Sequence, residues 1–254
     1  MIEKSVLRAA MEQSAADSGC AAEDFLKSEP VVVPSKKNPA ARKYLDLPFF
    51  CDLTSYGNNV VASTAEVFFP HVSAYLKKYP AEHCFETPNM RALEAALNPF
   101  GTGICFMAEY FLPSTNLRIL DSAFETRVLE KEDFGGLYLP EWSNALCEKR
   151  RNLDALAVGA YEKGRLVALA GASADCETMW QIGVDVLPGA RRRGAGAAVV
   201  SALAKEIVAR GKIPFYCAAW SNLRSVKTAL KCGFEPAWVQ LTAKPLGFIE
   251  ELNR

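Results

Sequence analysis

The 254-residue sequence has no excess charge of either sign, because 29 lysines and arginines balance 29 aspartates and glutamates. A protein that binds nucleic acid over its general surface carries net positive charge, so we expect no nucleic-acid partner. No apolar run approaches the roughly 20 residues that a membrane-spanning helix requires, and the N-terminus lacks the apolar core of a secretory signal. We therefore expect a cytoplasmic protein without a membrane partner.

The chain also lacks the clustered ligands that a structural metal site needs. Its eight cysteines are scattered without a CxxC pair, and the two histidines, His71 and His83, lie apart from any such pair. Structural zinc requires cysteine and histidine ligands at short, fixed spacings. We therefore expect no metal site and interpret the cysteines as reduced thiols in a reducing compartment.

What the sequence does contain is a strand, a turn and a cationic glycine loop in front of a long helix. Apolar and polar residues alternate over 181–186, which is the period of a strand. Residues 187–189, Leu-Pro-Gly, end that strand, since proline lacks an amide donor and glycine tolerates turn dihedrals. Residues 197–210 predict a largely buried helix, because their polar side chains form one narrow stripe, and Gly211 ends it.

The loop between this strand and this helix has the composition of an anion site. It carries Arg191, Arg192 and Arg193, followed by Gly194-Ala-Gly196. A helix N-terminus offers free amides and about half a positive charge, and glycine lets a ligand approach the backbone. Arginine suits phosphate oxygens. We interpret the loop as a diphosphate site; the alternative is a basic surface turn that caps a core helix.

A second motif follows on a second strand and helix. Residues 213–220 predict a short apolar strand. Ser221 or Asn222 can cap the helix that follows, and Gly233 ends it.

The order and separation of these two motifs resemble the GNAT N-acetyltransferase superfamily and, within it, its FR47-like members. The first motif is Arg191-x-x-Gly194-x-Gly196 after a strand, and the second is Asn222-x-x-Ser225 with Gly233-Phe234 at the end of its helix. The resemblance covers residues 123–245. It implies an α/β (α+β) fold, in which a mixed central sheet is flanked by helices, and acetyl-CoA as the co-substrate.

The resemblance also implies roles for the residues of the site. Backbone groups of Val184 and Val186 would pair with the acetyl and pantetheine amides of the coenzyme, and the Val184 amide would stabilise the thioester oxyanion. Asn222 would bond the pantetheine arm, with Ser225 in the same motif, unless Asn222 is a plain helix cap. The diphosphate would be held by the loop, whose residues are Arg191, Arg192, Arg193, Gly194, Ala195, Gly196 and Ala197.

The implied reaction needs a base for the attacking amine and an acid for the leaving thiolate. Many members of the superfamily place a tyrosine seven residues after the motif asparagine, but here that residue is Ala229. Ser225 and Tyr216 are the candidate substitutes. Glu177 and Asp185 are the nearest carboxylates and our candidate bases, although Glu177 also fits an exposed turn and Asp185 a structural acceptor.

The first half of the chain lies outside the resemblance. We expect residues 1–118 to form a smaller α/β domain and residues 119–254 to form the acetyltransferase domain. By analogy with two-domain acetyltransferases, the first domain would contribute to the acceptor site. Within the second domain we expect a helical stretch over 130–148, interrupted at Gly135-Gly136 and at Pro140, and a hairpin formed by 155–161 and 165–173.

The sequence thus predicts an acyl-CoA-dependent N-acyltransferase that acetylates a primary amine on a small molecule or a peptide, as a monomer or homodimer. A non-catalytic coenzyme A-binding sensor or interaction module remains open, because neither acid nor base is clear. A dinucleotide oxidoreductase is the weaker alternative. Gly194 and Gly196 match two of the three fingerprint glycines, but Val199 takes the third place and no acid closes the strand at 213–220.

Overall fold

The computed structural model describes all of residues 1–254, which divide into two compact units. Unit 1 comprises Met1–Leu7 and Tyr110–Pro236, and unit 2 comprises Arg8–Glu109 and Ala237–Arg254. The domains 1–118 and 119–254 stay a prediction, but this division differs from them, because residues 237–254 pack with unit 2. None of the α-helices combines the length and the apolarity needed to cross a bilayer.

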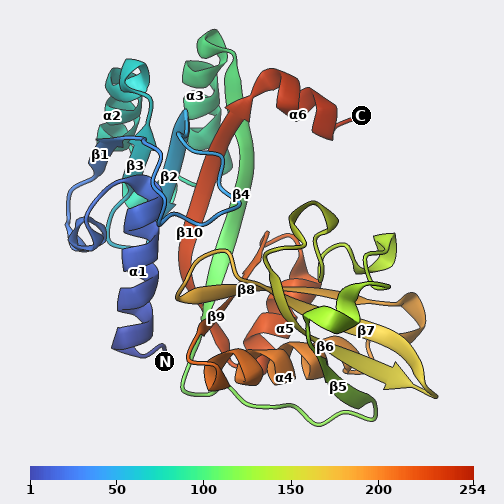
Figure 1. Cartoon of the computed structure of the whole chain (residues 1–254). Coiled ribbons are helices and arrows are strands. Elements are labelled where there is room, and N and C mark those ends of the chain that lie inside the picture. The colour runs from blue at the N-terminus through green and yellow to red at the C-terminus, as the bar shows by residue number, and fades with distance from the viewer. The chain divides into compact units, whose positions relative to one another are not determined.

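Unit 2 is a mixed sheet accompanied by helices (Figure 1). Strand β1 is parallel to β3, whereas β2 is antiparallel to both β3 and β10. Strands β10 and β4 each begin in one unit and end in the other. The strands, in sheet order, are β1 (Val31–Pro34), β3 (Val61–Thr64), β2 (Cys51–Ser55), β10 (Phe234–Pro245) and β4 (Thr102–Pro113), and the helices are α1 (Lys4–Ser18), α2 (Phe69–Lys78), α3 (Thr87–Leu97) and α6 (Leu246–Leu252).

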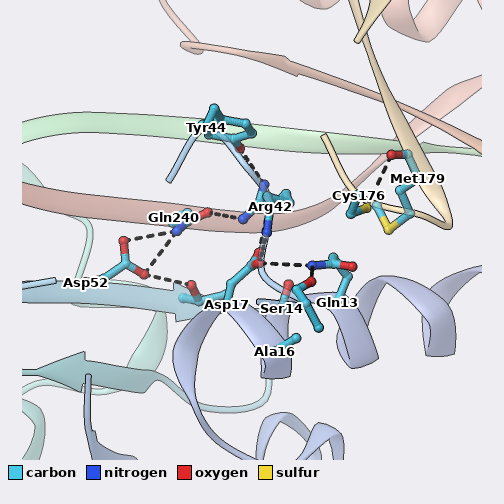
Figure 2. A network of polar contacts seen from close by, with 12 residues as sticks. Gln13, Ser14, Ala16, Asp17, Arg42, Tyr44, Asp52, Cys176, Met179 and Gln240 are labelled. Atoms are coloured by element: carbon cyan, nitrogen blue, oxygen red, sulfur yellow. Dashed lines mark hydrogen bonds and ion pairs between the residues drawn. The ribbon is translucent and has the colours of Figure 1, made fainter. Parts of the chain in front are cut away.

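A buried polar network stabilises unit 2 (Figure 2). Arg42, only 3% exposed, donates hydrogen bonds to Asp17, to the Tyr44 hydroxyl at 2.7 Å and to Gln240 Oε1 at 2.9 Å. Gln240 in turn donates to both carboxylate oxygens of Asp52, at 3.0 and 3.1 Å. Loss of hydration raises the pKa of the fully buried Asp52 to about 6. The network joins α1, β2 and β10 to the segment that contains Arg42.

Unit 1 contains the sheet that carries the predicted site. Neighbouring strands are antiparallel from β5 to β8, and β8 is parallel to β9. The predicted hairpin is confirmed as β6 and β7; its turn, Lys163-Gly164, has φ values of 51° and 78°, as a type I′ turn requires. The strands are β5 (Glu125–Leu129), β6 (Asp154–Glu162), β7 (Arg165–Ser173), β8 (Met179–Val186) and β9 (Ile213–Ala218), and the helices are α4 (Ala195–Ala209) and α5 (Leu223–Cys232).

The two faces of this sheet are covered differently. Helices α4 and α5 bury one face in a core that includes Leu156, Ile182 and Leu203. The opposite face is covered by the segment between β5 and β6, through buried Trp142 and Leu146. The fold is therefore a mixed α/β sheet flanked by helices, as predicted.

The breaks expected in the helical stretch over 130–148 are confirmed, but its helical pieces are short 3₁₀ turns and not α-helix. The segment forms 3₁₀ turns at Lys131–Phe134, Pro140–Trp142 and Glu148–Arg150. Gly135-Gly136 and Pro140 interrupt a continuous helix, because glycine is flexible and proline cannot donate an amide hydrogen bond. The turn residues Asn144 and Ala145, which follow the second 3₁₀ turn, place their backbone carbonyls against the sheet.

Candidate functional site

The predicted site is centred on a gap between the parallel strands β8 and β9. The two strands pair from Met179 and Ile213 as far as Ile182 and Tyr216, where the pairing ends. Strand β8 continues to Val186 and β9 to Ala218. The last residues of β8 therefore lack a strand partner on the side toward β9.

The backbone of Val184 and Val186 faces this gap. Strand β8 pairs with β7 without a register shift, and just beyond it the Leu187 amide donates to the Val167 carbonyl of the β7 side. Amides of successive strand residues point to opposite edges, so the amides of Val186 and Val184 point away from β7. Arg191 Nε donates to the Val186 carbonyl at 3.1 Å from that same side. At this edge the expected ligand position therefore offers the amides of Val184 and Val186, whereas the Val186 carbonyl is already bonded to Arg191.

The glycine loop leads from the end of β8 to an uncapped helix N-terminus. Gly194 precedes α4 in the left-handed conformation, with φ of 91°, and no side chain caps the helix. The first hydrogen bond to the loop runs from the Ala198 amide to the Gly194 carbonyl. The amides of the three preceding residues, 195–197, therefore have no partner within the helix. At Gly196 an added Cβ would lie 3.1 Å from Val186 Cγ2, so glycine allows α4 to pack closely on β8.

The three arginines of the loop have different surroundings. Arg193 is paired with Glu162 at 2.5 Å, and its guanidinium lies 4.9 Å from the centre of the Phe124 ring. Arg191 is held by the Val186 carbonyl through Nε. Arg192 is exposed, has φ of 60° and makes no side-chain hydrogen bond or ion pair. Arg192 is therefore the arginine most available to a diphosphate.

Asn222 and Ser225 lie together at the start of α5. Asn222 is the N-cap of α5, because its Oδ1 accepts the Ser225 amide at 3.3 Å. Gly233 ends the helix with φ of 93°, as predicted. The Ser225 hydroxyl interacts with the phenol of Tyr216, which lies on β9. The structure thus connects the second motif to the residue at which the β8–β9 pairing ends.

The structure favours Tyr216 as the candidate acid more clearly than the sequence does. It is 2% exposed and packs near Phe234, at 6.3 Å between ring centres. Burial raises the pKa of its phenol, whereas the hydrogen bond with Ser225 lowers it. Ala229, which stands where a tyrosine is expected, is fully buried against the same core. Tyr216 is therefore a buried phenol on the residue at which the β8–β9 pairing ends.

The deciding comparison concerns the segment that carries both motifs. Residues 157–242 match the family model described as FR47-like protein. This segment is an FR47-like domain. The resemblance to the GNAT superfamily is thereby confirmed for this part of the chain.

Solved structures with similarity to the chain include a GNAT-family acetyltransferase from Novosphingobium aromaticivorans, with 20% identity, a TM-score of 0.43, and 56% of this chain and 66% of that chain covered. A GCN5-related N-acetyltransferase-like protein from Streptococcus suis has 21% identity and a TM-score of 0.45 over 61% and 69% of the two chains. An aminoglycoside N-acetyltransferase in complex with CoA has 19% identity and a TM-score of 0.36 over 46% and 91%. A search of the curated proteins found no match.

Asp185 of the FR47-like domain is an anchor for the segment that covers the sheet. Its carboxylate accepts hydrogen bonds from the amides of Asn144 and Ala145, at 2.8 and 2.9 Å, and from Asn144 Nδ2 at 2.7 Å. The same segment lies directly on glycine backbone: a Cβ at Gly183 would be 1.8 Å from the Asn144 carbonyl oxygen, and one at Gly171 would be 1.9 Å from that of Ala145. These contacts occupy Asp185 and favour its structural role over that of a base.

Glu177 lies away from the gap. It is exposed in the turn before β8, where its backbone carbonyl accepts a hydrogen bond from Lys212 Nζ at 2.7 Å. The paired part of β8 and β9, from Met179 to Ile182, separates it from the open part. The structure therefore brings together Val184, Val186, the loop, Asn222 and Ser225, but it does not bring Glu177 to them.

Sequence reasoning missed two residues that shape the loop, Glu162 and Phe124. Glu162 ends β6 and pairs with Arg193, and the bond to this guanidinium lowers the pKa of the Glu162 carboxyl. Phe124 lies under the same guanidinium. An acidic residue beside a hairpin turn was the only available signal, and it does not specify a partner 31 residues away. No group of three or more histidine, cysteine or acidic side chains could hold a metal ion, and the lack of a metal cofactor stays a prediction.

Proposed function

We propose that the protein is an acyl-CoA-dependent N-acyltransferase that moves an acetyl group from acetyl-CoA to a primary amine. The observation that carries the proposal is the gap between β8 and β9, which begins at Ile182 and Tyr216 and leads to the uncapped N-terminus of α4. An extended ligand with amides along its length and a diphosphate at one end fits an open strand edge that is followed by a helix N-terminus. The match of residues 157–242 to the FR47-like family supports it.

Each part of the coenzyme would meet a different group of the chain. The amides of the pantetheine arm would pair with the backbone of Val184 and Val186, as one strand pairs with another. The diphosphate would lie at the amides of residues 195–197, with the free side chain of Arg192 beside it. The Val184 amide would donate to the thioester oxygen and stabilise its developing negative charge. Asn222 would fix the start of α5 at the gap.

Fewer residues are assigned to the proton transfers than to coenzyme binding. The amine would attack the thioester carbon, and the carbon–sulfur bond would break to release the thiolate. Tyr216, with Ser225 against its phenol, would supply the proton to that sulfur. The contacts of Asp185 and the distant position of Glu177 leave water as the first acceptor of the amine proton. Glu177 and Asp185 stay predictions as bases, and so does a contribution of residues 1–118 to the acceptor site.

Two measurements test the proposal. Titration calorimetry with acetyl-CoA is expected to show binding to the parent protein and none to a Gly196→Glu variant, whose added side chain would press on Val186 and displace the start of α4. Thiol release from acetyl-CoA is then followed across a panel of small amines, amino acids, polyamines and peptide amino termini. Absence of heat for the parent would contradict coenzyme binding, and equal heats for parent and variant would contradict its placement at the loop. Binding without thiol release across the panel would favour the alternative of a coenzyme A-binding module.

A further inference from the structure

A cavity of about 470 Å³ lies in unit 2, and all of its lining residues fall within 37–47 of the loop that connects β1 to β2. Pro39, Leu45 and Leu47 give it an apolar wall. Its volume falls within the range of small-ligand sites, roughly 300–1,000 Å³. The lining lies outside residues 157–242, so the cavity is not part of the FR47-like domain.

The loop around the cavity is fixed by hydrogen bonds to α1 and within itself. Asn38 Nδ2 donates to the Ala16 carbonyl of α1 at 2.8 Å, and the Ala41 amide donates to the Asn38 carbonyl at 3.1 Å. The Arg42 amide donates to the Asp17 carboxylate at 2.8 Å, and the Arg42 side chain is held in the buried polar network of unit 2 (Figure 2). The loop is therefore ordered before a ligand arrives, so binding loses little free energy to ordering the chain.

The uncompensated charges of the lining are positive. Lys37 and Lys43 are exposed, and their side chains make no hydrogen bond or ion pair within the chain. No acidic residue lines the cavity, and Asp46, which lies beside two lining residues in the chain, is paired with Lys244 at 3.4 Å. Two unpaired cations beside an apolar wall suit a small organic anion, because the cations attract its acidic group and the wall removes its apolar part from water.

We propose that this cavity binds a small organic anion, whose phosphate or carboxylate group faces Lys37 and Lys43 and whose apolar part lies against the wall of Pro39, Leu45 and Leu47. The inference is independent of the proposed function, because the two sites share no residue. It gives unit 2 a role of its own in binding a small molecule. A ligand that binds the folded loop would also stabilise unit 2 against unfolding.

The test uses phenyl phosphate and benzoate as probes, with neutral benzyl alcohol for comparison. Each is titrated while the amide signals of residues 37–47 are followed in two-dimensional NMR spectra. The variant Lys37→Gln with Lys43→Gln removes both unpaired charges. The matched control is Lys36→Gln, because Lys36 is an exposed, unpaired lysine next to Lys37 that does not line the cavity. Thermal unfolding of each protein checks that the fold is intact.

We expect the better of the two anions to bind the parent about tenfold more tightly than benzyl alcohol and to shift the signals of residues 37–47. Whether that anion is phenyl phosphate or benzoate identifies the acidic group of the ligand. The double variant should bind it about tenfold more weakly than the parent, whereas Lys36→Gln should change the affinity less than twofold.

Three results would overturn the inference: no binding of either anion, signal shifts confined to residues outside 37–47, or equal affinities for the parent and the double variant. A hexaglutamate peptide, which is too large for the cavity, separates a small ligand from an acidic protein partner. Tighter binding of this peptide than of both anions would assign the lysines to such a partner and overturn the inference as well.

Discussion

Replacing Gly183 by alanine tests whether Asp185 is an anchor. The added Cβ would lie 1.8 Å from the Asn144 carbonyl oxygen, so the segment around Asn144 must retreat by about 1.2 Å to reach even 3.0 Å. That movement breaks or lengthens the three hydrogen bonds from Asn144 and Ala145 to the Asp185 carboxylate. Hydrogen bonds to charged groups contribute about 1.5–3 kcal/mol each when buried, and these are partly exposed. We expect Gly183→Ala to lower the free energy of unfolding by about 2–4 kcal/mol.

Urea denaturation of the parent and four variants provides the measurement. Gly189→Ala is the matched control, because its Cβ would meet nothing within 4 Å, and it should change the free energy of unfolding by less than about 1 kcal/mol. Asp185→Asn should cost about as much as Gly183→Ala. The double variant should cost little more than either single one, because both act on the same segment. A loss below about 0.5 kcal/mol for Gly183→Ala, or additive losses, would refute the reasoning.

Three further predictions concern the loop, the phenol and the buried network. Arg192→Ala should weaken acetyl-CoA binding about fivefold in calorimetry. Arg193→Ala should change the affinity less than twofold, because the Arg193 guanidinium is already paired with Glu162. A larger loss for Arg193→Ala than for Arg192→Ala would contradict the assignment of Arg192 to the diphosphate. Tyr216→Phe should keep the melting temperature but slow thiol release roughly 10²-fold. The rate of thiol release should also change its dependence on pH on the basic side. An unchanged pH dependence would exclude the phenol as the acid. Asp52 binds its proton more tightly in the folded than in the unfolded state, since its pKa rises from 3.8 to about 6. The free energy of unfolding should therefore fall by about 2 kcal/mol between pH 4 and pH 7 relative to Asp52→Asn. Urea denaturation at each pH measures this difference, and a difference that stays constant with pH would contradict the prediction.

The elements that could be predicted are those whose signal is local. The strand over 181–186, the hairpin of β6 and β7 and the cap of α5 at Asn222 depend on period-two patterning, a Lys-Gly turn and a short polar side chain. Each of these depends on neighbours within a few residues. In the segment 130–148 the breaks at Gly135-Gly136 and Pro140 are local signals as well, but the contacts of Asn144 and Ala145 with Gly183 and Gly171 of other strands could not be predicted in this way.

The candidate site shows the same limit. Sequence motifs located the loop, but they could not rank Arg191, Arg192 and Arg193, since the three differ only in the partners that folding provides. Likewise Asp185 was a candidate base until its hydrogen-bond donors, about 40 residues earlier in the chain, were known. The position of Tyr216 at the gap depends on where the pairing of β8 with β9 ends. Neither strand's own sequence specifies that point.

The interleaved order of the two units has a consequence for synthesis on the ribosome. Unit 2 takes its last strand and helix from residues 237–254, whereas unit 1 is complete once Pro236 has emerged. Domains generally fold as they leave the ribosome, from the N-terminus onward. Here residues 8–109 must wait for residues 237–254 before unit 2 is complete, with the edge of β2 uncovered meanwhile. A premature stop near residue 236 would therefore keep all residues of unit 1 and remove the strand that covers β2 in unit 2.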